Sequence, residues 1–365
     1  MNNRINNPST IVVAMSGGVD SSVVAAMLHE QGHKVIGITL QLYDHGIATK
    51  KKNACCAGQD IYDARVIADK LNIPHYILDY ESKFKESVID DFADSYIRGE
   101  TPLPCIKCNQ SVKFKDLLKV AKYLGADCLA TGHYVRKIEG IGGAELHTGI
   151  DARKDQSYFL FATTLEQLNY LSFPLGGLSK EQTRDFASKF NLSVADKPDS
   201  QDICFVPDGD YRKVISGIRK NANEQGKIIH VDGFELGTHN GIINYTIGQR
   251  RGLGIAFQTP LYVVRIDPTT KIVYVGPDSA LDSTEFTIKD VNWLGKKMTE
   301  QEEIDVKVKI RSTRPATFAK ISKISHTEIR VKLMSAEKAV TPGQACVIYD
   351  NDRVLGGGWI TREIS

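Results

Sequence analysis

The stretch STIVVAMSGGVDSSVVAAMLHEQG, residues 9–32, decides the fold. Its first part is a short apolar run rich in β-branched residues, which predicts a buried strand. Its last part is mainly apolar and ends at Gly32, which is typical of a helix terminus. Between them, Gly17 and Gly18 permit a tight turn. A strand, a glycine turn and a helix in this order predict an anion-binding loop, because a helix N-terminus offers unbonded N–H groups.

The alternation of strands and helices continues outward from this stretch. We predict further strands over 33–44, 75–80 and 127–135, and helices over 60–73, 84–100 and 112–126, with 101–110 as a loop. Such alternation implies a parallel sheet covered on both faces, which binds ligands beyond the carboxyl ends of its strands.

Beyond about residue 210 the pattern changes to hairpins and short alternating runs, which predict a small β-barrel at the end of the chain. We therefore expect an α/β fold with three domains. These are an N-terminal parallel-sheet catalytic domain over 1–210, a small β-rich central domain over 211–282 and a C-terminal β-barrel over 283–365.

The charge, the length of the apolar runs and the number of cysteines limit the class of protein. The 365 residues carry a net charge of +2, which neither requires nor excludes a nucleic-acid partner. No apolar run approaches the roughly 20 residues of a membrane span, and the polar start MNNRINNPST lacks the apolar stretch of a signal peptide. We expect a cytoplasmic chain without a membrane partner. Seven cysteines in a reducing compartment indicate metal or redox chemistry rather than structural disulfides.

The glycine loop lacks the Gly-Lys-Ser/Thr ending of a Walker A motif, which disfavours ordinary NTPase chemistry. Asp20 places a carboxylate where it could hold Mg²⁺ beside a phosphate. SGGVDSS resembles the loop of the PP-loop ATP pyrophosphatases, which cleave ATP between its α and β phosphates and adenylate a carbonyl oxygen. The resemblance implies ATP as the nucleotide. It implies nucleotide contacts at Ala14, Met15, Ser16, Gly17, Gly18, Val19, Asp20, Ser21, Leu40 and Gly132.

The cysteines fall at a predicted helix start, in a predicted loop and in predicted strands. Cys108 is placed at the start of a predicted helix, with Asn109, Gln110 or Ser111 as its cap, and the positive end of a helix lowers a thiol pKa. Cys204 follows Pro198 and acidic turn residues, which predict an exposed loop. Cys128 and Cys346 fall in predicted strands and are expected to be buried.

Six motifs narrow the family. TPLPCIKCNQSVKF, ATGHY, KDQSYFL, DSQDICF, YTIGQRRGLG and PGQACVIYD together resemble the tRNA-specific 2-thiouridylase family over nearly the whole chain. The resemblance implies a sulfurtransferase that adenylates the C2 oxygen of the wobble uridine, position 34 of tRNA, and replaces that oxygen with sulfur from a cysteine persulfide. The products would be 2-thiouridine, AMP and pyrophosphate. It implies Cys108 as the nucleophile and Cys204 as the persulfide carrier, with a disulfide between them after transfer.

The partners follow from the same resemblance. The anticodon loop of tRNA is the implied substrate, and a cysteine desulfurase or a sulfur-relay protein is the expected sulfur donor. We expect a monomer. The segments that resemble the tRNA contacts of the family supply His133, Lys154, Asp155, Gln156, Arg311, Ser312 and Gln344.

One departure from the family stands out. Many members carry Asn-Pro-Asp where this chain has Leu103, Pro104 and Cys105, and Cys105 cannot supply the carboxylate that contacts the target base. We expect no resident metal. A metal centre built from Cys55, Cys56, Cys105 and Cys108 remains an alternative. So do an amide-forming PP-loop ligase and a non-catalytic tRNA-binding protein, and the sequence does not decide between direct persulfide attack and release of hydrosulfide.

Overall fold

The computed structural model describes residues 8–43, 56–199, 203–206, 209–299 and 302–361. Within them the chain forms two compact units, each assembled from separate parts of the sequence. The first unit draws on 1–87, 105–205 and 352–354, and the second on 88–104, 206–351 and 355–365.

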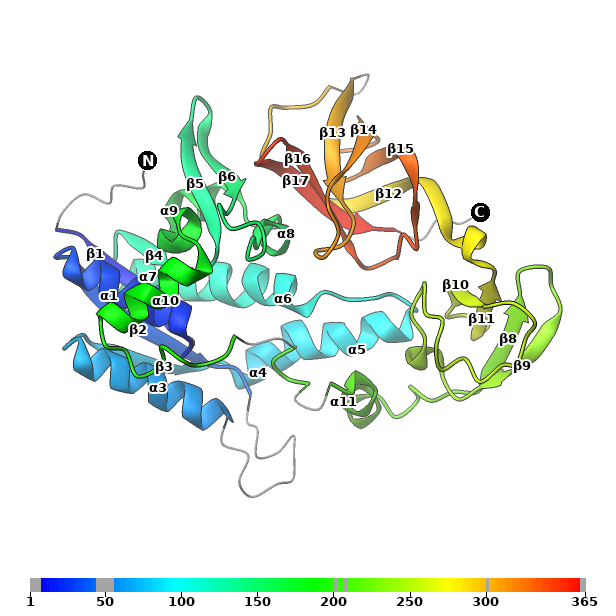
Figure 1. Cartoon of the computed structure of the whole chain (residues 1–365), viewed down its shortest axis with the longest axis horizontal. Coiled ribbons are helices and arrows are strands. Elements are labelled where there is room, and N and C mark those ends of the chain that lie inside the picture. Colours follow the sequence, from blue (N-terminus) through cyan, green and yellow to red (C-terminus); the bar gives the residue numbers. More distant parts are fainter. Residues whose placement is uncertain (1–7, 44–55, 200–202, 207–208, 300–301, 362–365) are drawn as a thin grey trace. The chain divides into compact units, whose positions relative to one another are not determined.

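The first unit is built on a five-stranded sheet in the order β3-β2-β1-β4-β7 (Figure 1). All its pairings are parallel, which confirms the predicted sheet. The strand predicted over 127–135 is shorter than expected and ends at Ala130, and a separate strand begins at Val135. The strands of this sheet are β1 (Thr10–Ala14), β2 (Lys34–Gln41), β3 (His75–Asp79), β4 (Cys128–Ala130) and β7 (Leu171–Ser172).

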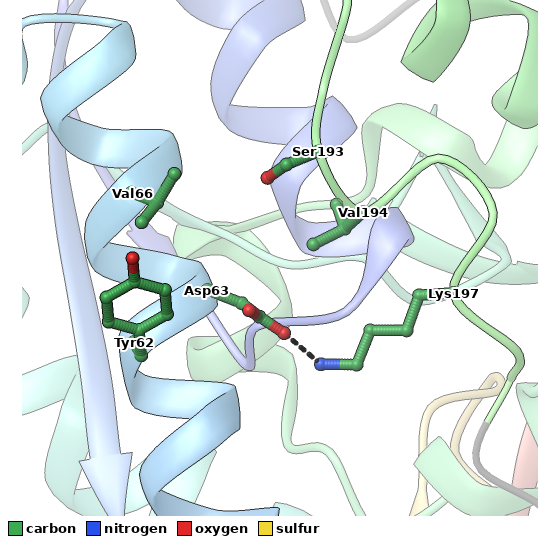
Figure 2. A pocket seen from close by; sticks show the side chains of 6 residues that line it. All are labelled: Tyr62, Asp63, Val66, Ser193, Val194 and Lys197. Atoms are coloured by element: carbon green, nitrogen blue, oxygen red, sulfur yellow. Dashed lines mark hydrogen bonds and ion pairs between the residues drawn. The ribbon is translucent and has the colours of Figure 1, made fainter.

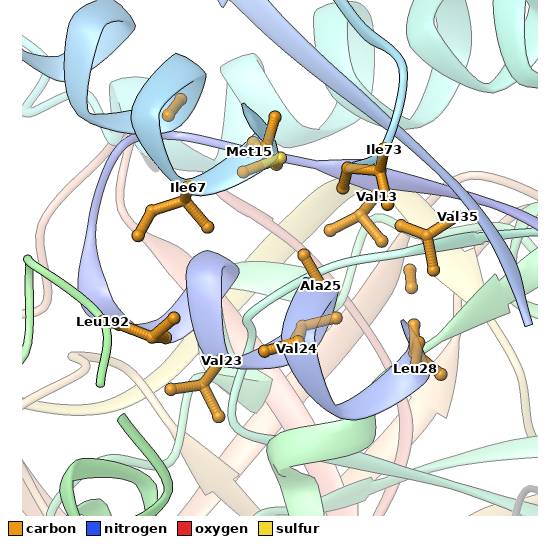
Figure 3. Packing of buried hydrophobic residues seen from close by; sticks show 14 of the residues in the cluster. Val13, Met15, Val23, Val24, Ala25, Leu28, Val35, Ile67, Ile73 and Leu192 are labelled. Atoms are coloured by element: carbon orange, nitrogen blue, oxygen red, sulfur yellow. The ribbon is translucent and has the colours of Figure 1, made fainter. Parts of the chain in front are cut away.

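The core of this unit lies between the sheet and helices α1 (Val19–Glu30), α3 (Cys56–Lys70) and α10 (Lys180–Lys189). Ile11 and Val13 alternate along β1 and belong to one core. Figure 3 shows Val13 in this core with Val23 and Val24 of α1 and Ile67 of α3. Each such side chain contributes roughly 1.5–3 kcal/mol when it is fully buried. The strand and the helix that flank the glycine loop are therefore held firmly.

The prediction of a loop over 101–110 holds for 101–103 and is wrong from Pro104 onward. A helix begins at Pro104 and runs through α6 (Pro104–Lys107), the π-helical segment η2 (Cys108–Leu117) and α7 (Leu118–Tyr123). Proline suits the first turn of a helix because its missing N–H would have no intrahelical partner there. Cys105 and Cys108 therefore lie on one helical stretch.

The other elements of the first unit cover the sheet and extend from it. The predicted helix over 84–100 is observed as a helical stretch whose later part belongs to the second unit. This stretch is α4 (Glu81–Phe84), the π-helical η1 (Lys85–Ile89) and α5 (Asp90–Ile97). The remaining elements are β5 (Val135–Gly140), β6 (Gly143–Thr148), α8 (Ser157–Leu160), α9 (Leu165–Tyr170) and η3 (Pro174–Gly177).

The second unit begins with a helix pair and a small sheet. Arg219, just after α11 (Tyr211–Ile218), binds Asp90 at 2.9 Å and Asp94 at 2.8 Å, which ties α11 to α5. The sheet has the order β10-β11-β8-β9, and both predicted hairpins are present in it. Its elements and the two short 3-10 helices near it are β8 (Gly226–His230), β9 (Glu235–His239), η4 (Ile242–Asn244), β10 (Tyr262–Asp267), β11 (Ile272–Gly276) and η5 (Asp278–Leu281).

The predicted C-terminal β-barrel is confirmed. Its strands follow the order β12-β15-β14-β13-β16-β17, and β12 also pairs with β17, which closes the barrel. Alternate side chains such as Val308, Val331 and Ile348 fill its interior. The strands are β12 (Asp282–Trp293), β13 (Glu303–Lys309), β14 (Thr317–Lys323), β15 (Ile329–Lys338), β16 (Ala345–Asp350) and β17 (Arg353–Ile360).

Among the described helices of the chain, none has the length and apolar character that a membrane span requires.

Candidate active site

The loop between β1 and α1 has the backbone geometry of an anion site. Gly17 has a φ of +73°, and a Cβ atom there would lie 2.1 Å from the carbonyl oxygen of Asp60. Gly18 is the N-cap of α1, and no side chain of the described residues caps that helix. The N–H groups of its first turn have no intrahelical acceptor, so they are available to a phosphate.

Three neighbouring strands bring the other predicted nucleotide contacts to the same edge of the sheet. Ala14 ends β1, Leu40 lies near the end of β2, and Gly132 follows β4. Gly132 packs directly on the loop, because a Cβ atom there would lie 3.0 Å from both the Cβ of Asp20 and the N of Ser21. Within the loop, the N–H of Ser16 donates to the Oγ of Ser21 at 3.1 Å.

An ion-pair network, here called the Asp199 network, joins the loop to two other segments. Lys180 Nζ binds the Oδ1 atoms of both Asp20 and Asp199 at 2.7 Å, and Lys154 Nζ binds Asp199 Oδ2 at 2.7 Å. Tyr134 also donates its hydroxyl to Asp20 at 2.7 Å. Burial opposes ionisation of Asp199, but the hydrogen bonds from Lys154 and Lys180 outweigh it and lower the pKa of this carboxyl.

A second cation holds the opposite side of the loop. Lys197 Nζ donates to the carbonyl oxygen of Gly17 at 3.0 Å and to the carboxylates of Asp60 at 2.7 Å and Asp63 at 2.5 Å. The same lysine lines a cavity of about 390 Å³ between α3 and the segment before Lys197 (Figure 2). The lining residues are Tyr62, Asp63, Val66, Ser193, Val194 and Lys197.

Three thiols gather near the start of the helical stretch that contains α6 and η2. Cys105 and Cys204 are exposed, whereas Cys108 is only 6% exposed. Desolvation by the surrounding protein, followed by the charges of Cys108 and Cys105, raises the pKa of the Cys204 thiol to about 12. The next residue, Phe205, packs edge-on against Phe84 of α4 with ring centroids 5.8 Å apart, and α4 lies against η2, so the segment of Cys204 lies beside the helical stretch of the other two thiols. The exposed position of Cys204 confirms its prediction, and the burial of Cys128 and Cys346 confirms theirs.

The prediction of a low thiol pKa at Cys108 is wrong. The helix begins at Pro104, four residues before Cys108, so the proposed caps lie inside the helical stretch and two of them bond elsewhere. Asn109 donates to the carbonyl of Phe159 at 3.3 Å, and Ser111 donates to the carbonyl of Lys107 at 2.6 Å. Burial instead raises the pKa of Cys108, and only Lys113 counteracts this effect.

Lys113 was missed by the sequence reasoning. It lies five residues after Cys108 in a π-helical segment, where an i to i+5 hydrogen-bond pattern brings such residues one turn apart. Its charge lowers the pKa of all three thiols. Burial and then Lys113 lower the pKa of His133 to about 3, so His133 is neutral and offers hydrogen bonds rather than charge. Phe114 of η2 packs against His133 with ring centroids 5.8 Å apart, and Gly132 packs on the loop, so the helical stretch that carries Cys105 and Cys108 lies next to the nucleotide loop.

Several of the other residues predicted to contact tRNA form hydrogen bonds to other residues of the protein. Asp155 accepts bonds from the N–H of Gly149 at 3.1 Å and the hydroxyl of Ser157 at 2.8 Å, and Gln156 accepts one from the N–H of Tyr134 at 2.9 Å. These two residues therefore shape the segment beside Lys154. In the second unit, Arg311 donates to Ala339 at 2.6 Å, Gln344 donates to Thr101 at 3.1 Å, and Ser312 is half-buried.

The metal alternative finds no support in the part of the chain that the structure describes. There, no group of three or more His, Cys, Asp or Glu side chains is arranged to hold a metal ion. Cys55 lies outside the described residues, as does the side chain of Cys56.

Comparison with known proteins covers the whole chain. Residues 9–208 match the tRNA methyl transferase HUP domain, 215–277 match the tRNA methyl transferase PRC-barrel domain, and 283–360 match the aminomethyltransferase beta-barrel domain. The tRNA-specific 2-thiouridylase MnmA of Rickettsia massiliae (strain Mtu5) is 73% identical over 356 residues, which covers 98% of each chain. The protein of the same name from Rickettsia bellii (strain OSU 85-389) is 70% identical over 364 residues, covering 100% of this chain and 99% of that one. A solved 4-thiouridine synthetase in complex with RNA and ATP shares 18% identity at a TM-score of 0.37 over 58% of this chain and 51% of that chain, which is too distant to inform the site.

Proposed function

Because the chain belongs to the tRNA-specific 2-thiouridylase family and is a tRNA sulfurtransferase, we propose that it thiolates C2 of the wobble uridine, position 34, at the expense of ATP. The family uses ATP, and the loop at Gly17 and Gly18 has the backbone geometry to bind its phosphates. The mechanism and the role of each residue below are our proposal.

The first step activates the base. The C2 oxygen of uridine attacks the α-phosphorus of ATP, an adenylyl group forms on that oxygen, and pyrophosphate leaves. Gly17, Gly18 and the first turn of α1 bind the phosphates through their N–H groups. Asp20 would hold Mg²⁺, which neutralises phosphate charge when bound. The Oδ1 atom of Asp20 accepts hydrogen bonds from Lys180 and Tyr134. No bond to its Oδ2 atom is found among the described residues, so Oδ2 is the atom that would bind the cation.

The second step delivers sulfur. In one route the terminal sulfur of a Cys204 persulfide attacks C2 and AMP leaves with the former C2 oxygen. The Cys108 thiolate then attacks the Sγ of Cys204, the bond to the transferred sulfur breaks, and 2-thiouridine is released with a Cys108–Cys204 disulfide. In the other route the Cys108 thiolate first attacks the Sγ of the Cys204 persulfide, the persulfide S–S bond breaks, and hydrosulfide leaves as the Cys108–Cys204 disulfide forms. Hydrosulfide then attacks C2 and AMP leaves with the former C2 oxygen. Both routes need a Cys108 thiolate, and Lys113 favours it.

The substrate and partners follow from this chemistry. A base in the anticodon loop can leave its stack to reach the edge of the sheet, as single-stranded RNA allows. We propose contacts to that loop by His133, Lys154, Asp155 and Gln156 of the first unit and by Arg311, Ser312 and Gln344 of the second. A cysteine desulfurase or a sulfur-relay protein supplies the persulfide. We further propose a cytoplasmic monomer with domains over 1–210, 211–282 and 283–365.

One observation carries the proposal: the segments of Cys108 and Cys204, far apart in the sequence, pack together beside the nucleotide loop, through Phe205 on Phe84 of α4 and through Phe114 of η2 on His133. The test is mass spectrometry of nucleosides from unmodified tRNA incubated with the protein, Mg-ATP and a persulfide source, with AMP measured in parallel. We expect 2-thiouridine and AMP with the native chain, and loss of 2-thiouridine by at least about 100-fold in Cys108→Ser and Cys204→Ser. Cys128→Ala, a buried thiol in β4, is the matched control.

Other results would point to the rival functions. Full ATP turnover without either cysteine would indicate an amide-forming ligase. Activity that requires a copurifying metal would indicate a metal-dependent thiolase. Absence of AMP in the presence of tRNA would indicate a binding protein without catalysis.

A further inference from the structure

Cys105 occupies a position from which it can reach Cys108. The two residues are three apart on the continuous helical stretch of α6 and η2. In a helix with a rise of 1.5 Å per residue and a radius of about 2.3 Å, residues three apart have Cα atoms about 5 Å apart. This separation lies within the range of about 4.4–6.8 Å that a disulfide tolerates. The Cα separation therefore allows a Cys105–Cys108 disulfide once a local adjustment brings the Cβ atoms from the roughly 5–6 Å of a regular helix to about 3.5–4.5 Å.

The three thiols differ in how easily an external reagent can reach them. Cys108 is buried at 6% exposure, whereas Cys105 and Cys204 are exposed. Cys204 precedes Phe205, whose ring packs on Phe84 of α4 at 5.8 Å between centroids, and α4 lies against η2, so Cys204 lies on a segment beside the helical stretch of Cys105. An exposed thiol next to a buried one, with a third in reach, is the arrangement that thiol–disulfide exchange requires.

We propose that Cys105 is the resolving cysteine of this enzyme, which opens the Cys108–Cys204 disulfide after each sulfur transfer. The inference rests on the proposed function, because only a reaction that ends in that disulfide needs a resolving thiol. It gives Cys105 a catalytic role of its own.

The exchange that regenerates Cys204 uses only thiols of the protein, and an external dithiol then reduces the disulfide that remains. The Cys105 thiolate attacks the Sγ of Cys108, the bond between Cys108 and Cys204 breaks, and Cys204 leaves as a thiolate that can accept a new persulfide. The product is a Cys105–Cys108 disulfide. A dithiol reductant, either a small molecule or a Cys-x-x-Cys protein, then attacks the exposed Sγ of Cys105 and leaves both thiols reduced and itself oxidised. Lys113 lies near all three sulfurs and stabilises each leaving thiolate.

The test compares the native enzyme with Cys105→Ser under single and multiple turnover. With persulfide preloaded on Cys204 and tRNA limiting, we expect equal yields of 2-thiouridine, within about twofold. With excess tRNA, persulfide donor and limiting dithiothreitol, we expect the variant to turn over about tenfold more slowly, and higher dithiothreitol to restore it. Cys128→Ala should match the native enzyme in both assays.

Peptide mapping gives a readout independent of rate. Trypsin cleaves after Lys107, so Cys105 and Cys108 fall on separate peptides. After turnover without reductant and alkylation of free thiols, the native enzyme should yield a Cys105–Cys108 cross-link and Cys105→Ser a Cys108–Cys204 cross-link. Only Cys108–Cys204 in the native enzyme, or loss of single-turnover yield in Cys105→Ser, would overturn the inference. If the native enzyme makes no 2-thiouridine at all, the proposed function itself fails.

Discussion

The nucleotide loop and the thiol cluster lie side by side in the first unit but use charge in opposite ways. Around the loop, Lys180 and Lys197 each bind two carboxylates at 2.5–2.7 Å, and Lys154 adds a third cation. Around the thiols, Lys113 is the cation that lowers their pKa values, and desolvation by the surrounding protein raises those values. The loop is built with charges already in place, whereas the thiols are held largely protonated.

This difference matches the two chemical tasks. A polyphosphate carries charge throughout binding and reaction, so fixed dipoles and ion pairs that need no rearrangement serve it well. A thiolate is needed only briefly, and an uncharged thiol is protected from oxidation until sulfur arrives. The comparison predicts that loop variants fail in nucleotide binding and thiol-site variants fail in sulfur transfer.

The largest effect is expected at Gly17. Gly17→Ala places a Cβ atom 2.1 Å from the carbonyl of Asp60 and strains a φ of +73°, so the loop must move. We expect ATP affinity, measured by calorimetry, to fall by about 100-fold, which is about 3 kcal/mol.

Gly32→Ala is the matched control for that experiment. Gly32 has a φ of +83°, but a Cβ atom at this position would have no neighbouring atom within 4 Å, so the substitution carries the backbone strain without the clash. It should cost about 1–2 kcal/mol of stability and leave ATP affinity unchanged. An equal loss of affinity in both variants would show that the contact with Asp60 does not shape the site.

An intermediate effect is expected at Asp199. Asp199→Asn removes a carboxylate shared by Lys154 and Lys180, and we expect the KM for ATP to rise by about tenfold. The free energy of unfolding at neutral pH should fall by about 1–3 kcal/mol. Asp196→Asn, an exposed carboxylate for which no ion pair is found among the described residues, should change neither quantity.

The pH dependence of the Asp199 effect has a defined sign. The folded-state pKa of Asp199 is lowered, so its contribution is present above the unfolded-state pKa and is lost as the pH falls through the folded value. Urea unfolding should show a gap between the native chain and Asp199→Asn at neutral pH that closes in acid. A gap that stays constant down to acid pH would mean that the ion pairs do not carry the effect.

The smallest effect is expected at Lys113. Lys113→Met removes the cation that lowers the pKa of Cys108, so the rising limb of the pH–rate profile for sulfur transfer should move to higher pH. At neutral pH we expect a roughly three- to tenfold slower transfer, since one pKa unit is a tenfold change in thiolate. Lys115→Met, two residues away and exposed, should leave the profile in place. A lower rate without a shift of the limb would assign Lys113 a structural role.

The sequence predicted the regular parts of this molecule well. The β-branched run at 10–14 and the helix ending before Gly32 are observed, because strand burial and helix termination are local properties. The barrel was also predictable from alternating runs. The segment 101–110 was not, since Pro104 was interpreted as part of a loop although it begins a helix.

The charged partners of the site were beyond sequence reasoning for a different reason. Asp199 and Lys180 depend on tertiary contacts between segments that are separated in the chain. The pKa of Cys108 was predicted in the wrong direction because burial, which a local motif does not reveal, outweighs helix position. Lys113 lay in the quoted motif TPLPCIKCNQSVKF, and its spacing from Cys108 would have revealed it only in a π-helix.

The central claim is that base activation belongs to the loop and sulfur transfer to the thiols. Its most direct test is to incubate the Cys108→Ser, Cys204→Ser double variant with unmodified tRNA and ATP labelled at the α-phosphate. We expect the label to appear on the tRNA with an equal amount of pyrophosphate, because adenylation needs neither cysteine. Absence of both label and pyrophosphate, in a folded variant that still binds ATP, would contradict the claim and place the thiols in the activation step.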